Sequence, residues 1–241
     1  MPETVQRIET YYAGAYWGPR QESPEECARR AEVFLTALRD VDPSFSRWFR
    51  QARSRKEALT RPIEPHRAAL EKLIRQGKDR VAEALGYSLR TWNGECDDYD
   101  DSGFQLDCGG SSERVPNTCV FKLPTRGPNA ERVLSAPVLT RLVRSLALAW
   151  EPDCAIATSS VHMDQVTTTG RPGTFVGWIM YVPHSRGQVP LLPAPVRTEP
   201  VEDKGTLLIL TPERFTAANP VHVELAQRVH ELLDRAGLLG A

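Results

Sequence analysis

An acidic run near the middle of the chain has oxygen-bearing side chains at the spacing that a calcium loop uses. It begins at Asp98 and reaches a glycine at Gly103, as in the first half of an EF-hand loop, where alternate oxygens and a glycine turn surround a hard cation. The twelfth position of such a loop supplies a bidentate carboxylate, but here it is Gly109. The pattern therefore predicts no calcium site, and the sequence indicates no metal or other cofactor.

A second group has the residue types that nucleophilic catalysis needs. Cys154 could supply a thiol, His162 a base and Asp164 an acid, provided that they fold to within hydrogen-bond distance. Cys154 begins a predicted apolar strand, where a buried, unreactive thiol is the commoner outcome. The chain also lacks a Walker phosphate loop, a nucleophile elbow and a zinc-protease motif. We predict no enzyme and no catalytic residue, with a hydrolase that uses His162 and Asp164 as the alternative.

A stretch between Arg47 and Arg61 mixes basic and aromatic residues, as a nucleic-acid-binding surface does. Trp48 and Phe49 can instead pack inward while the arginines lie along a solvated helix face. The whole chain has a formal net charge of -1, without the basic excess of a nucleic-acid-binding domain. We therefore predict no direct nucleic acid binding.

Negative charge is concentrated in one short window. Residues 91–113 hold seven acids and no Lys or Arg. Like charges this close repel unless water or a partner offsets them, so the window fits either a solvated turn or a patch that pairs with a partner's basic surface. In the second case Tyr99 would add an aromatic anchor. The hypothesis of partner binding covers Glu95, Asp97, Asp98, Tyr99, Asp100 and Asp101.

The elements that must position these residues divide the chain in two. Before residue 86 the apolar periodicity is mostly helical, and Ser23 with Glu26 forms a capping box with proline at the first helical position. The elements predicted there are a strand near Ile8–Tyr16 and helices over 24–40, Phe45–Ala58 and Pro65–Gln76.

After Gly86 the chain becomes rich in short β-prone runs. Phe104 and Leu106 alternate with Gln105 and Asp107, the pattern of a strand with one face in water. The predicted strands are Tyr87–Trp92, Phe104–Cys108, Asn117–Leu123, Ala155–Val161, Phe175–Val182 and Thr206–Leu210, and the predicted helices are Asn129–Trp150 and one from Asn219 to Gly237.

Helices at both ends of a central run of strands favour an α+β fold, with a central, largely antiparallel sheet flanked by helices. We expect one domain over residues 1–241, helical over 20–85 and sheet-rich over 86–241, with the proline-rich segment Val189–Pro200 crossing its surface. The N-terminus has no apolar signal core, and no apolar run approaches the roughly 20 residues that span a bilayer. The five cysteines are scattered, which favours reduced thiols and a cytoplasmic protein without a membrane anchor.

Three further groups of residues carry a family resemblance. They are Tyr11-Tyr12-Ala13-Gly14-Ala15-Tyr16-Trp17-Gly18-Pro19-Arg20 running into Glu22–Leu38, the turn Trp92-Asn93-Gly94, and Gly177-Trp178 followed by Gly205-Thr206 and the ending Ala236-Gly237-Leu238-Leu239. In these segments the chain resembles the immunity protein 52 family of bacterial polymorphic toxin systems, and the resemblance spans nearly the whole chain.

The resemblance implies an α+β protein that binds and neutralises a cognate toxin, often encoded beside it and delivered by routes such as type VI secretion. Toxins linked to this family include nucleases of the restriction-endonuclease fold. In the motifs, Trp92 and Trp178 are expected as buried anchors, while Gly94 and Gly177 meet backbone needs. The resulting hypothesis is that the Trp92–Gly103 turn presents acids to a basic cleft of the toxin. An adaptor protein without a toxin target is the remaining alternative.

Overall fold

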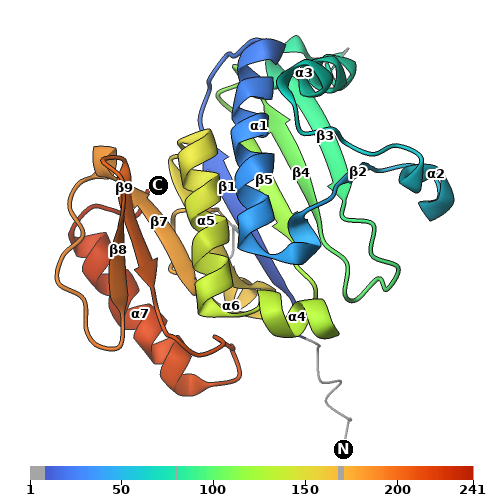
Figure 1. The fold of residues 1–241 in the computed structure, drawn as a ribbon. Coiled ribbons are helices and arrows are strands. Elements are labelled where there is room, and N and C mark those ends of the chain that lie inside the picture. The colour runs from blue at the N-terminus through green and yellow to red at the C-terminus, as the bar shows by residue number, and fades with distance from the viewer. Residues whose placement is uncertain (1–8, 80, 168–170, 241) are drawn as a thin grey trace, which may run out of the picture.

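The computed structural model describes residues 9–79, 81–167 and 171–240, and it contains a nine-stranded sheet with helices packed on it (Figure 1). The strand order is β2-β3-β4-β5-β1-β6-β7-β9-β8, and every neighbouring pair is antiparallel. The sheet is open, so its two edge strands are β2 and β8. These features confirm the predicted α+β class with a largely antiparallel central sheet.

The bounds of the elements follow the chain. The strands are β1 Tyr11–Trp17, β2 Phe49–Arg50, β3 Tyr87–Trp92, β4 Gly103–Cys108, β5 Asn117–Lys122, β6 Cys154–Ser159, β7 Ile179–Pro183, β8 Arg197–Val201 and β9 Gly205–Ile209. The helices are α1 Pro24–Val41, α2 Arg55–Leu59, α3 Arg67–Gln76, α4 Pro128–Val133, α5 Ala136–Trp150, α6 Ser160–Val166 and α7 Pro220–Arg235, with 3-10 turns η1 Pro43–Phe45, η2 Glu83–Leu85 and η3 His184–Arg186.

Local signals placed the two longest helices correctly. At the start of α1 the Ser23 side chain accepts from the Glu26 backbone, and the Glu26 side chain accepts from the Ser23 backbone, so the predicted capping box is present. Asn219 caps α7 by accepting from the Val221 N–H, with proline in its first turn. The strand predicted near Ile8–Tyr16 is β1, and Ile8 lies outside the described residues.

Two predicted helices were wrong. The segment predicted as one helix over Phe45–Ala58 forms η1, β2 and the five-residue α2, because Trp48 turns inward onto Phe104 and Phe49 pairs with the edge of β3. The helix predicted over Asn129–Trp150 is two helices, α4 and α5, since a proline in the first turn of α5 cannot continue the hydrogen bonds of α4.

The sequence also gave no signal for α6 or for the edge strand β8. β8 lies at the end of the proline-rich segment and includes Pro200, a residue that is tolerated at sheet edges because it lacks a donor.

The helices cover the two faces of the sheet unequally. α1, α3 and α5 lie side by side across one face (Figure 1), where Phe34 of α1 packs edge-on against Phe104 and Phe121. On the opposite face, α6 and the segment before β7 cover β6, and α7 packs against them. There, an added side-chain carbon at Gly177 would lie 2.6 Å from Ile156, and α7 shares a pocket with α6. The strands β3, β4, β5 and β1 have helices on one face only.

Candidate partner-binding surface

The register of β1, β3, β4 and β5 brings side chains from four strands into rows on the uncovered face of the sheet. Directly paired residues of antiparallel strands point to the same side, and these rows lie opposite the side that carries Phe104 and Phe121. The rows are Tyr12, Lys122 and Gly103; Gly14, Val120, Gln105 and Arg90; and Tyr16, Thr118, Asp107 and Ser88.

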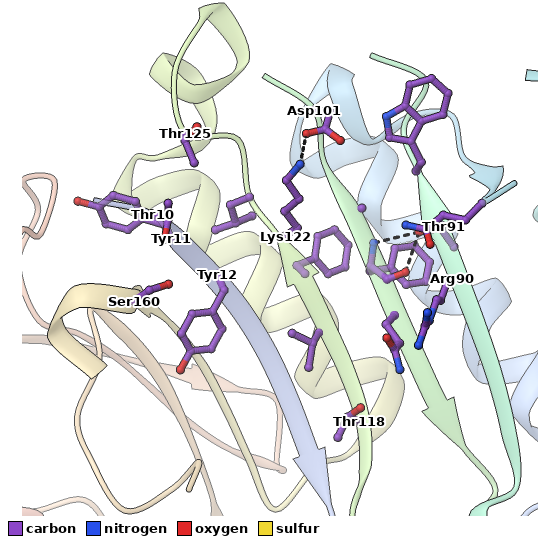
Figure 2. A pocket seen from close by; sticks show the side chains of 18 of the residues that line it. Thr10, Tyr11, Tyr12, Arg90, Thr91, Asp101, Thr118, Lys122, Thr125 and Ser160 are labelled. Atoms are coloured by element: carbon purple, nitrogen blue, oxygen red, sulfur yellow. Dashed lines mark hydrogen bonds and ion pairs between the residues drawn. The ribbon is translucent and has the colours of Figure 1, made fainter. Parts of the chain in front are cut away.

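We call this surface the open face and define it by its lining side chains. Figure 2 shows Tyr12, Lys122 and Arg90 projecting from three different strands toward one hollow, whose volume is about 920 Å³. Ser160 of α6 borders the hollow beside Tyr12. The open face consists of Tyr12, Arg90, Trp92, Gln105, Asp107, Thr118, Val120 and Lys122.

Hydrogen bonds fix the polar centre of the open face. Asp107 Oδ2 accepts from Gln105 Nε2 at 2.8 Å and from Thr118 Oγ1 at 3.3 Å. These partners are neutral, so the charge of this half-buried carboxylate is not cancelled by a cation. Arg90 is exposed, and among the described residues no carboxylate forms an ion pair with it.

Two tyrosines of β1 form the side of the open face nearest α6. Tyr12 Oη donates to Met163 Sδ of α6 at 3.2 Å, a weak acceptor. The ring of Tyr16 lies over Gly14, where an added side-chain carbon would be 2.6 Å from the phenol oxygen. Burial raises the pKa of both phenols, which keeps them protonated as hydrogen-bond donors.

The predicted acidic patch is a loop, residues 93–102, at one end of the open face. Asn93 holds its two ends together, because Asn93 Oδ1 accepts from the backbone N–H groups of Glu95 and Ser102. Lys122 ties the loop to β5 by an ion pair with Asp101 and a hydrogen bond to the Asp98 carbonyl (Figure 2). The acidic loop and the open face therefore form one continuous surface.

Two of the six acidic-loop residues in the binding hypothesis are buried. Asp100 is 6% exposed and Asp101 is 8% exposed. The Asp100 carboxylate accepts from the N–H groups of Asn129 and Ala130 in the first turn of α4, where the helix dipole favours a negative charge. These contacts give Asp100 and Asp101 internal partners and keep them away from solvent.

The other four residues lie toward solvent. Tyr99 is 46% exposed, with the Arg126 guanidinium 3.6 Å from its ring centroid. Asp97 accepts from the Tyr99 N–H, and Asp98 forms an exposed ion pair with Arg55. Glu95 accepts from the backbone of the next residue, and this hydrogen bond lowers its pKa.

The tryptophans and glycines of the family motifs have clear structural settings. Trp178 is fully buried, and its Nε1 donates to the Thr211 carbonyl at 2.9 Å. Trp92 is half-buried, packs against Phe49 and lines the hollow. Gly94 has a φ of +88°, and a side-chain carbon there would lie 2.7 Å from Phe49, so both its conformation and its surroundings favour glycine.

The residues of the hydrolase alternative are not assembled. His162 is 1% exposed and its Nε2 donates to the Val176 carbonyl, whereas Asp164, two residues along α6, is exposed. Cys154 begins β6 and His162 follows its end, so a full strand separates them. Burial raises the pKa of the Cys154 thiol to about 12, which disfavours the thiolate needed for attack.

Neither a metal site nor a membrane span is found in the described ranges. No group of three or more His, Cys, Asp and Glu side chains there is placed to hold a metal ion. None of the helices in those ranges combines the length and the apolar character needed to cross a membrane.

The sequence hypothesis missed most of the open face. Gln105 and Asp107 were recognised as the wet side of a strand, but Arg90, Thr118 and Lys122 were not connected with them. Each alternates with buried neighbours in its own strand, so the period-two pattern was present; the strand order that joins them was not readable.

A two-layer α+β scaffold with one uncovered, polar sheet face defines a protein with a surface suited to binding a macromolecule. The chain belongs to the immunity protein 52 family, whose model matches residues 9–241, and this confirms the resemblance drawn from the sequence. Among solved structures, its fold is similar to that of the Pseudomonas aeruginosa T6SS protein PA0821, with a TM-score of 0.53, 12% sequence identity, and coverage of 92% of this chain and 72% of that one. No curated protein matches the chain.

Proposed function

We propose that this chain is an immunity protein that binds a cognate protein toxin and neutralises it by covering the toxin's active or substrate-binding surface. Membership of the immunity protein 52 family is the observation that carries the proposal. The open face and the acidic loop, which lie side by side outside the packed core, are the surface that supports it.

The acidic loop supports a toxin with a basic cleft, as a nuclease of the restriction-endonuclease fold would have. Glu95, Asp97 and Asp98 lie at least partly in solvent, where negative charge speeds encounter with a cationic surface. The ion pair of Asp98 with Arg55 joins two exposed side chains, and such pairs contribute at most about 1 kcal/mol. Asp98 can therefore exchange Arg55 for a cation of the toxin at little cost. A nuclease toxin attacks nucleic acid in the cytoplasm, where its inhibitor would act.

The proposal is tested with the product of an adjacent toxin gene, produced in a catalytically inactive form for binding and in an active form for protection. Wild-type protein should bind the inactive toxin and restore growth to cells that express the active one. The absence of both binding and protection would refute the proposal.

A charge-neutralised pair tests the role of the acidic loop. Asp97→Asn with Asp98→Asn should lower the association rate about tenfold or more at low salt and reduce its salt dependence, because steering by rim charges acts mainly on this rate. The matched control is Glu224→Gln with Asp234→Asn, which removes two exposed acids from α7. Equal association rates for the two double variants would exclude the loop from the interface.

A further inference from the structure

The uneven covering of the sheet identifies a second, larger contact surface beside the acidic loop. On β6 and its neighbours, both faces are packed, and Ile156, Met180 and Leu208 fill the side opposite α5. On β4 and β5, the equivalent positions carry Gln105 and Val120, which are only half-buried. The change from apolar to mainly polar residues shows that the open face is built to meet water in the free protein.

We infer that the open face is the main docking surface for the toxin, and that it receives a protruding protein segment that brings a carboxylate to Arg90. This inference rests on the proposed function, since it names the part of the surface that the toxin contacts. The acidic loop would then form the rim of the interface.

The size and composition of the open face favour a protein segment as its occupant. Four adjacent strands about 4.8 Å apart, with about six residues each at about 3.3 Å, present roughly 400 Å², about half of the roughly 800 Å² that each partner contributes to a standard interface. The residues of the open face include Tyr12, Trp92 and Arg90, the residue types enriched at the centres of such interfaces. The open face is thus large enough for an interface centre that the rim completes.

The charges on the open face indicate a carboxylate opposite Arg90. Lys122 is already paired with Asp101, and Asp107 is held by neutral donors. The Arg90 guanidinium has no carboxylate partner within the described part of the chain, and its planar fork binds carboxylates through two parallel hydrogen bonds. An acidic residue on the toxin would satisfy it, whereas a uniformly basic toxin surface would fit only the acidic loop.

The test reverses the charge at Arg90 and at a matched position on the other side of the molecule. Arg90→Glu should weaken binding to the inactive toxin about 100-fold, as loss of a central anchor does. Arg29→Glu on the exposed side of α1 makes the same change behind the sheet and should leave affinity within about twofold of wild type, the range of a site away from the contact. Circular dichroism and thermal melting would show that both variants fold.

A suppressor selection then identifies the opposing residue. Toxin variants that regain binding to Arg90→Glu should replace an Asp or Glu by a neutral or basic residue. If folded Arg90→Glu binds the toxin as tightly as wild type does, the inference fails, although wild-type binding and protection would still support the proposed function. The inference also fails if Arg90→Glu abolishes only oligonucleotide binding or only self-association in sedimentation, because the open face would then hold nucleic acid or a second copy.

Discussion

Replacing Asp100 by alanine should destabilise the protein by about 3 kcal/mol. Its two carboxylate oxygens accept separately from the N–H groups of Asn129 at 3.1 Å and Ala130 at 2.9 Å. A hydrogen bond to a charged group contributes about 1.5–3 kcal/mol, and leaving a buried donor unpaired costs about 1–3 kcal/mol. The two bonds share one carboxylate and do not add fully, which gives the total of about 3 kcal/mol. Asp100→Asn keeps one acceptor oxygen and should cost about half as much.

Urea unfolding followed by tryptophan fluorescence measures both changes. Asp97→Ala is the control, because Asp97 is exposed in the same loop, and substitutions at such positions change stability by about 0.5 kcal/mol or less. If Asp100→Ala unfolds within about 0.5 kcal/mol of wild type, the carboxylate does not stabilise the start of α4, and the assignment of Asp100 to the scaffold is wrong. Asp100→Asn should also leave the toxin affinity of folded protein unchanged.

Two more stability predictions concern buried titratable groups. Burial lowers the pKa of His162, so its contribution is complete above about pH 6.5 and is lost as pH falls through the lower folded value; His162→Gln should reduce the change in melting temperature between pH 7 and pH 5. Burial alone would raise the pKa of Asp42, but hydrogen bonds from Arg132 and Ser44 outweigh it and lower the pKa. Asp42→Ala should therefore cost about 2–4 kcal/mol at pH 7 in urea unfolding and progressively less below about pH 4.

The sequence predicted those elements whose signals are local. The capping box at Ser23 and the cap at Asn219 fixed the starts of α1 and α7 within the residues that form them. Alternation in Phe104–Cys108 gave β4 and its wet side for the same reason. A pattern of this kind is complete within a few residues, so no knowledge of the rest of the fold is needed.

The errors lie where a distant segment decides the local structure. Trp48 faces Phe104, more than fifty residues away, and this contact outweighs the helical pattern predicted over Phe45–Ala58. The burial of Asp100 and Asp101 likewise depends on Asn129 and Lys122 from later in the chain. A count of charges along the sequence cannot separate acids that hold the loop from acids that face a partner.

The charge that the acidic loop offers to a partner is smaller than its composition indicates. Asp101 is paired with Lys122, Asp98 with Arg55, and Asp100 with the first turn of α4. Steering by this loop then speeds encounter but adds little to the final affinity, since exposed charges are screened by salt. Tight binding must come from contacts that exclude water, which only the adjoining open face has the area to make. Affinity lost at Arg90 should therefore persist at high salt, whereas the effect of neutralising the loop should fade.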